Sequence, residues 1–162
     1  MSSVGTFYNG YSPLDRSDHL EAQKRQIAAG ELTPASGPCA LCGDQDSPVE
    51  YHAEDYAQPY CWTPPAAYAL CLYCHRHQLH RRFRWPETWT AYLAHVRRGG
   101  YARDLQNPTV RLEFEFYRWS IKRGQSVFLY PLRPYTKAVG TEWFAGLRMD
   151  VQSLRDPAAR PR

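Results

Sequence analysis

Two pairs of cysteines in this chain have the spacing of a tetrahedral zinc site. Cys39 and Cys42 form one Cys-x-x-Cys pair, and Cys71 and Cys74 form the other. Each pair can curl a short turn of backbone around one side of a Zn²⁺ ion, and two pairs complete its coordination sphere. One pair alone could be a redox motif, but these two account for four of the five cysteines. The sequence therefore predicts a structural zinc ion held by four thiolates.

Histidines surround and follow the second cysteine pair. His77 and His80 are three residues apart, so on a helix they share one face. His75 precedes His80 by five residues, which places it well off that face of an α-helix. His52, between the two cysteine pairs, belongs to the segment Glu50-Tyr-His-Ala-Glu-Asp-Tyr56.

Residues 39–84, about a quarter to a third of the chain, resemble the HNH nucleases, in the cysteine-bearing branch of the ββα-metal group. The resemblance rests on the order of the motifs: Cys-x-x-Cys, a strand with a histidine and an acidic Asp-Tyr segment, then Cys-x-x-Cys-His and a further His with Arg. It implies a β-hairpin with a metal ligand and a general-base histidine, a helix with further ligands, and a separate structural zinc. The implied activity is DNA phosphodiester hydrolysis assisted by Mg²⁺, Mn²⁺, Ni²⁺ or Zn²⁺ at a second site.

The resemblance assigns roles to individual residues. His80 matches the metal ligand on the helix, His77 could join it, and His52 is the histidine of the hairpin. His75 is expected to support or cap the site without binding the metal. Asp55 is expected to orient a ligand histidine through a hydrogen bond, as carboxylates beside metal ligands commonly do.

The catalytic pattern is incomplete in this sequence. If His52 is the ligand, Ala53 occupies the position of the base; if His52 is the base, Tyr51 stands where the ligand should be. The family's asparagine is missing too, because no asparagine occurs between Asn9 and Asn107. Water could still be activated by Glu54, Asp55 or His77, and spacing does not choose between them.

Basic side chains adjoin the second cysteine pair and favour a nucleic acid, DNA in particular, as partner. They are Arg76, Arg81, Arg82 and Arg84. The alternative for this cluster is an ordinary solvated surface. Three functions remain open: an HNH-like DNA endonuclease, a catalytically inactive zinc module that binds nucleic acid, and an adaptor that binds a protein through the aromatics of residues 109–149.

The composition limits the class of protein. The chain has no apolar run of eighteen residues and no basic-then-apolar N-terminus, so neither a membrane span nor a secretory signal is expected. Cysteines paired for metal binding suit a reducing compartment, so the cytoplasm is expected. The net charge of +4 is small, and the oligomeric state is not indicated.

The pattern predicts an α+β protein: a zinc-bound ββα core with extra helices and a C-terminal β-hairpin. We expect a helix from Ser17 or Asp18 to Ala29, short strands at residues 49–52 and 67–70, and a helix over about 75–84. Another helix should begin at Pro86 and end at Gly99-Gly100. Residues 109–130 alternate like a hairpin, with a helix over 110–122 as the alternative, and residues 141–149 resemble a short helix.

These elements divide the chain into four parts. Residues 1–38 are expected to be an N-terminal arm and helix, and residues 39–100 the zinc-bound core with its following helix. Residues 101–155 form an aromatic-rich extension, and residues 156–162 a disordered tail.

Overall fold

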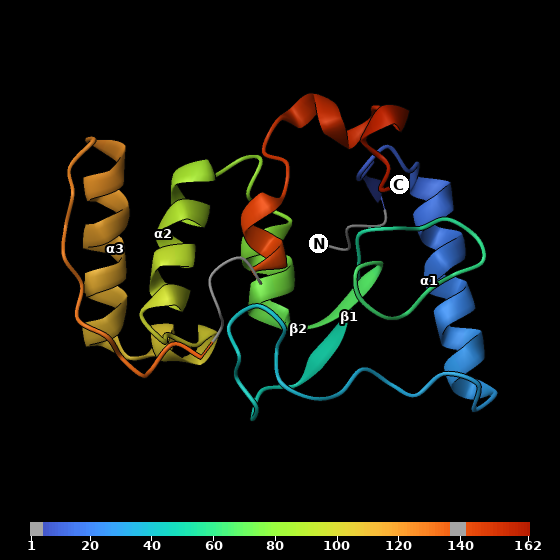
Figure 1. Ribbon diagram of the computed structural model, residues 1–162, viewed down its shortest axis with the longest axis horizontal. Helices are drawn as coiled ribbons and strands as arrows, with labels where there is room; N and C mark the ends of the chain where they lie inside the picture. The colour runs from blue at the N-terminus through green and yellow to red at the C-terminus, as the bar shows by residue number, and fades with distance from the viewer. Residues whose placement is uncertain (1–4, 137–141) are drawn as a thin grey trace.

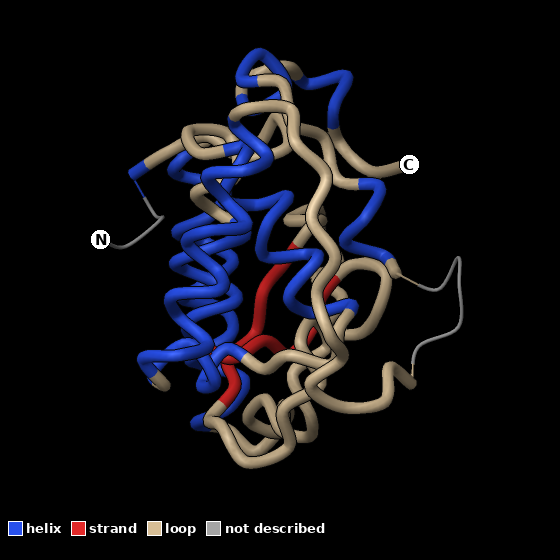
Figure 2. Tube along the Cα trace, turned by 90° about the vertical axis from the view of Figure 1, so that its left-hand side faces the viewer, coloured by secondary structure: helices blue, strands red, loops and turns tan. Residues whose placement is uncertain are grey.

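A computed structural model describes residues 5–136 and 142–162 of the 162-residue chain as a mixture of helices and one small sheet. The sheet is an antiparallel pair, β1 (Val49–Ala53) and β2 (Ala67–Cys71). In Figure 1 this pair lies between α1 (Pro13–Ala28) and the two neighbouring helices α2 (Pro86–Arg97) and α3 (Pro108–Lys122). Figure 2 shows that, apart from these two strands, the described chain is mainly helix and loop. The expected α+β class agrees with this architecture.

The two strands coincide with the segments predicted from alternation. In their register His52 pairs with Tyr68, and Val49 pairs with Cys71. The hairpin thus carries a histidine near one end and begins the second cysteine pair at the other. Among the described residues, no helix has the length and apolar character needed to cross a membrane.

The helix after β2 differs in its winding from the expected one. The segment η2 (Tyr73–Leu79) is a π-helix, and the amide of His80 donates to the carbonyl of His75 at 3.2 Å, five residues back. Turns replace the expected helix from residue 81 to residue 84. Helix α2 then starts with Pro86 in its first turn, as predicted, and buries the side chains of Trp89 and Tyr92.

The N-cap of helix α1 lies five residues before the earlier of the two predicted caps, Ser17. Ser12 is its N-cap, and Ser12 and Asp15 form a capping box in which each side chain accepts from the other's backbone amide. Pro13 occupies the first helical position, where its missing N–H costs nothing. The prediction placed the cap at Ser17 or Asp18 because it overlooked this Ser-Pro-x-Asp signal.

The predicted hairpin over residues 109–130 is wrong, and its alternative, a helix over 110–122, is confirmed, because residues 108–122 form α3. Asn107 caps this helix through its side chain, and Pro108 occupies the first turn. The side chains that pack against the core are Val110, Phe114, Tyr117 and Ile121. Their spacing of four, three and four residues is that of a helix face, whereas the alternating Leu112 and Phe116 are exposed. Ser126 to Tyr130, the expected second strand, is a loop.

Residues 142–162, at the C-terminal end, pack against the core of the protein. Of the expected helix over 141–149, Thr141 lies outside the described residues, and the described part holds the short 3₁₀ helix η4 (Trp143–Gly146) with Phe144 fully buried. Residues 156–162, expected to be disordered, include the 3₁₀ turn η6 (Pro157–Ala159) and buried Ala159. This end of the chain lies against the N-terminal arm.

Candidate metal centres

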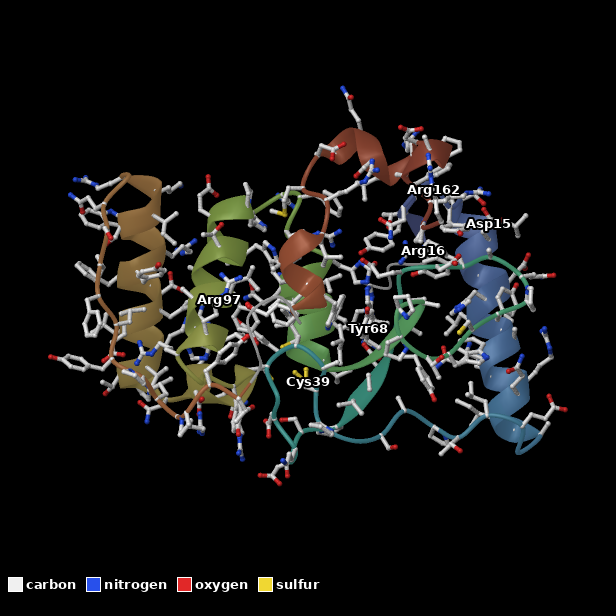
Figure 3. All side chains as sticks on the ribbon, viewed as in Figure 1. Asp15, Arg16, Cys39, Tyr68, Arg97 and Arg162 are labelled. Atoms are coloured by element: carbon white, nitrogen blue, oxygen red, sulfur yellow. The ribbon has the colours of Figure 1, made fainter. Side chains whose placement is uncertain are left out.

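The four cysteines of the two Cys-x-x-Cys pairs meet in one buried cluster. All four Sγ atoms lie within 4.8 Å of one another, and none of these cysteines forms a disulfide. Figure 3 shows Cys39 beside the point where β2 leads into η2. Gly43 closes the first turn with a φ of +84°, and its amide donates to the carbonyl of Cys39 at 2.8 Å. The cluster could therefore hold a zinc ion with four sulfur ligands.

The protonation of the cluster favours a cation. Hydrogen bonds from Cys42, Cys71 and Cys74 lower the pKa of Cys39 far below its usual value, since they stabilise its thiolate. Burial and the neighbouring sulfurs raise the pKa of Cys74 well above its usual value. The four buried sulfurs therefore cannot all be thiolates without a cation beside them. A divalent ion that replaces their protons would stabilise all four thiolates.

Two aromatic residues support this cluster from elsewhere in the chain. The Tyr92 hydroxyl of α2 lies 2.9 Å from Cys74 Sγ and is fully buried. The Trp143 indole nitrogen donates to the carbonyl of Ala40 at 3.1 Å, inside the first cysteine turn. The Trp143 ring also stacks on Tyr68 of β2, with ring centroids 3.7 Å apart. The C-terminal extension therefore holds the first cysteine turn against the hairpin.

Tyr92→Phe should weaken the hold of the cysteine cluster on zinc. The substitution removes a hydrogen bond to a thiolate ligand while keeping the ring, and lost partners of metal ligands typically cost about tenfold or more in affinity. The rate of zinc transfer to a coloured chelator should rise about tenfold. Tyr73→Phe is the matched control. It also removes a tyrosine hydroxyl, but one that accepts a hydrogen bond from Gln78 at 3.2 Å, and it leaves the contact between Tyr92 and Cys74 in place. Equal transfer rates for the two variants would show that the Tyr92 contact contributes nothing.

A second cluster is formed by His52, His75 and His80. One ring nitrogen from each lies within 4.8 Å of the others, so this group could also hold a metal ion. The Nε2 atoms of His75 and His80 are 3.0 Å apart. The His52 ring is 5.2 Å from that of His80 and 5.0 Å from that of His75, measured between centroids. We call these three residues the histidine triad.

The π-helical winding of η2 decides which histidines join the triad. Bonds from residue i to i+5 place residues five apart almost above one another, so His75 and His80 share a face. Residues three apart no longer do, and His77 is exposed and stacks on Tyr73 at 5.3 Å. The structure thus brings in His75, expected only as a supporting residue, and leaves out His77. The expectation assumed α-helical spacing, and π-turns are often found at functional sites.

Two of the triad histidines each have a carboxylate at one ring nitrogen. His75 Nδ1 lies 2.6 Å from Glu50 Oε1, and His52 Nε2 lies 3.1 Å from Glu54 Oε2. Burial alone would raise the pKa of Glu50, but hydrogen bonds from His75 and Arg76 lower it to about 2. Such carboxylates fix the tautomer so that the opposite nitrogen presents its lone pair.

The chemistry of the triad fits a metal site. His52 Nδ1 is buried and has no hydrogen-bond partner among the described residues, as expected for a nitrogen that binds an ion. Burial lowers the pKa of His52 and of His80 well below the usual value, so both rings are neutral, which metal binding requires. Three imidazoles are a donor set typical of sites for zinc and similar transition metals.

The N-terminal arm supplies two residues that the sequence analysis did not assign to this site. The Tyr8 hydroxyl donates to Glu54 Oε2 at 2.5 Å, and Asn9 Nδ2 donates to the same oxygen at 3.2 Å. Burial, more than these hydrogen bonds can offset, raises the pKa of Glu54. The signal that could have located the arm is Asn9-Gly10 between two tyrosines, since Asn-Gly is the strongest short hairpin signal.

The remaining candidate residues lie elsewhere. Asp55 accepts from the Tyr11 hydroxyl at 2.5 Å and from the amide of Ala57, and Glu54 instead makes the contact with His52 that was expected of Asp55. Arg82 is 1% exposed and donates to the carbonyls of Leu79 and Arg148, so it is not available on the surface.

The other three arginines of the predicted basic cluster are exposed. Arg76 is bound by both oxygens of Glu50, at 2.8 and 2.7 Å. Arg84 lies over the ring of Trp85, and Arg81 is exposed next to His80. The basic surface after η2 therefore consists chiefly of Arg81 and Arg84.

Comparison with protein family models, with curated proteins and with solved structures gave no match to this chain.

Proposed function

We propose that the protein is a divalent-metal-dependent nuclease that cleaves DNA at the histidine triad, with a structural zinc ion in the cysteine cluster. The observation that supports this most is the convergence of His52, from the hairpin, with His75 and His80, from the following helix. An HNH-like site requires this arrangement of hairpin and helix around one ion. Carboxylates on His75 Nδ1 and His52 Nε2 leave the opposite ring nitrogens for the ion, and His52 Nδ1 has no other partner among the described residues.

The residues in and around the triad have different roles in this proposal. His52, His75 and His80 hold the ion, and Glu50 and Glu54 orient two of them. A divalent ion bound there would neutralise the charge that develops on the 3′ oxygen of a phosphodiester. Of the three side chains that could take a proton from water, Glu54 contacts the triad, whereas Asp55 and His77 are engaged elsewhere. Glu54 therefore also replaces the base that Ala53 cannot provide.

The donor set narrows the choice of metal. Imidazole nitrogens suit zinc and nickel, while Mg²⁺ prefers oxygen ligands and usually keeps several waters. Three histidines without a carboxylate ligand thus favour Zn²⁺ or Ni²⁺ over Mn²⁺ and Mg²⁺.

Contact with the DNA backbone would come from Arg81 and Arg84, the exposed arginines that follow the triad. Trp85 is 46% exposed beneath Arg84 and adds a flat surface for an unstacked base. Phosphate contacts of this kind position a nucleic acid without reading its sequence.

The second candidate function is a non-catalytic module that binds nucleic acid and uses both clusters as structural metal sites. The observation that favours it is the burial of the triad: His52 is fully buried, and Glu54 is 8% exposed. A metal ion enclosed in this way would link the hairpin to the helix and would not be accessible to a substrate.

Plasmid nicking separates the two functions. The protein is stripped of weakly bound metal, supplied with Zn²⁺, Ni²⁺, Mn²⁺ or Mg²⁺, and incubated with supercoiled DNA. Nicking that requires the added transition metal and disappears in His52→Ala supports the nuclease. DNA retention in a gel shift without nicking under any metal contradicts it and supports the binding module.

A further inference from the structure

The N-terminal arm is folded into one tight turn, Tyr8-Asn9-Gly10-Tyr11. The amides of Tyr8 and Tyr11 each donate to the other residue's carbonyl, at 3.1 and 2.9 Å. Asn9 and Gly10 have φ angles of +49° and +76°, the positive values that a type I′ turn requires at both central positions. Tyr8, Asn9 and Tyr11 are all buried. We call these four residues the arm turn.

The arm turn forms hydrogen bonds with the Glu54 carboxylate, which in turn contacts His52. Glu54 Oε2 accepts from the Tyr8 hydroxyl and from Asn9 Nδ2, and His52 Nε2 lies 3.1 Å from the same oxygen. Asn9 Nδ2 also donates to the Glu54 carbonyl at 3.0 Å. A carboxylate held by three groups cannot turn freely. Its fixed position keeps His52 Nε2 engaged and leaves Nδ1 for an ion.

The C-terminal end of the chain holds the arm turn from its other side. The Gly10 amide donates to the Leu154 carbonyl at 3.0 Å, and Arg160 donates through two nitrogens to the Gly10 carbonyl, each at 3.2 Å. The Arg160 guanidinium also lies 4.5 Å from the centre of the Tyr11 ring. Figure 1 shows this end of the chain beside the N-terminal arm. A side chain on Gly10 would meet the Asp156 carbonyl oxygen, so the two ends touch directly.

We propose that Tyr8 and Asn9 are positioning residues of the histidine metal centre, and that residues 154–160 set their position. The two ends of the chain thus act on His52 through one path: Arg160 fixes Gly10, the arm turn fixes Glu54, and Glu54 orients the ring. This inference rests on the proposed function only in requiring that the triad bind a divalent ion. It does not require DNA cleavage.

Metal binding by the full chain tests the proposal. Tyr8→Phe removes the hydroxyl that reaches Glu54 and keeps the buried ring. Tyr11→Phe is the matched control, because it removes an equally short tyrosine–carboxylate hydrogen bond from the same turn, but one that ends on Asp55. Arg160→Ala releases the turn from the C-terminal side. Cadmium NMR distinguishes the two clusters, because thiolate-bound and imidazole-bound ions resonate in different regions, and zinc competition titrations give the affinity of the weaker site.

We expect Tyr8→Phe to weaken the imidazole-bound site about tenfold and to leave the thiolate-bound signal unchanged. Arg160→Ala should weaken the same site by a smaller factor, and Tyr11→Phe should leave both signals as in the wild type. Equal affinity of wild type and Tyr8→Phe, with both ions bound, would overturn the positioning role while leaving the proposed function intact. An unchanged site in Arg160→Ala would overturn the part assigned to residues 154–160. A wild type that binds no second ion would overturn both the proposed function and this inference.

Discussion

Cys74→Ala should abolish cooperative folding of the protein and its zinc content. Cys74 is fully buried in the cluster of four sulfurs, and the hairpin, η2 and the first cysteine turn all meet there. Zinc contributes on the order of 10 kcal/mol to the folding of small zinc modules. That amount is comparable with the whole stability of a typical domain, about 5–15 kcal/mol. Loss of one ligand therefore removes most of the free energy that keeps this region folded.

Cys61→Ala is the control for this prediction. Cys61 is exposed, lies outside the cysteine cluster, and its sulfur is hydrogen-bonded to Thr63. Metal analysis of the purified proteins and thermal unfolding by circular dichroism measure the two effects. The wild type and Cys61→Ala should retain the zinc and one cooperative transition. A Cys74→Ala protein that unfolds at the wild-type temperature would refute a structural role for the cluster.

His80→Ala should remove the second bound ion and lower DNA cleavage at least 100-fold. His80 Nε2 lies 3.0 Å from the Nε2 of His75, and the His80 ring is next to that of His52. The substitution therefore removes one of the three nitrogen ligands of the triad. Two imidazoles should hold an ion more weakly than three, and a metal-assisted hydrolysis requires the ion to be held in place. The cysteine cluster does not include His80, so one zinc per chain should remain.

His77→Ala isolates the triad from a general effect of helix substitution. His77 comes from the same π-helix, is exposed, and stacks on Tyr73 outside the triad. Its replacement should leave the metal content and the cleavage rate within about twofold of the wild type, as is usual for surface changes. The opposite pattern, with activity lost in His77→Ala and kept in His80→Ala, would show that the triad is not the site of cleavage.

Chain-local patterns predicted much of the central region. The two Cys-x-x-Cys pairs, the strands at residues 49–52 and 67–70, and the start of α2 at Pro86 all depend on spacing or on residues within a few positions of each other. Short-range rules apply to such features because the interactions that create them are themselves short-range. The same rules favour the helix over 110–122, which was only the alternative to the hairpin, since Asn107-Pro108 and the four-three-four spacing of its packed residues are local signals.

Other parts of the candidate site depended on contacts that no local pattern contains. The Glu54 carboxylate meets Tyr8 and Asn9 across 46 and 45 positions of the chain, and Arg160 meets Gly10 across 150. Nothing near Glu54 in the sequence indicates these partners. Trp143 likewise reaches the first cysteine turn across 103 positions.

The sequence by itself determined that four thiolates come in two paired turns on either side of a hairpin that carries His52. Only the tertiary structure decided that His75 and not His77 joins His52 and His80, and that Glu54 and not Asp55 contacts His52. The reason is that ligand choice depends on a few tens of degrees of helix winding and on side chains delivered from both ends of the chain. Spacing rules assume α-helical winding in η2, whereas packing against the hairpin occurs with the wider π-turn.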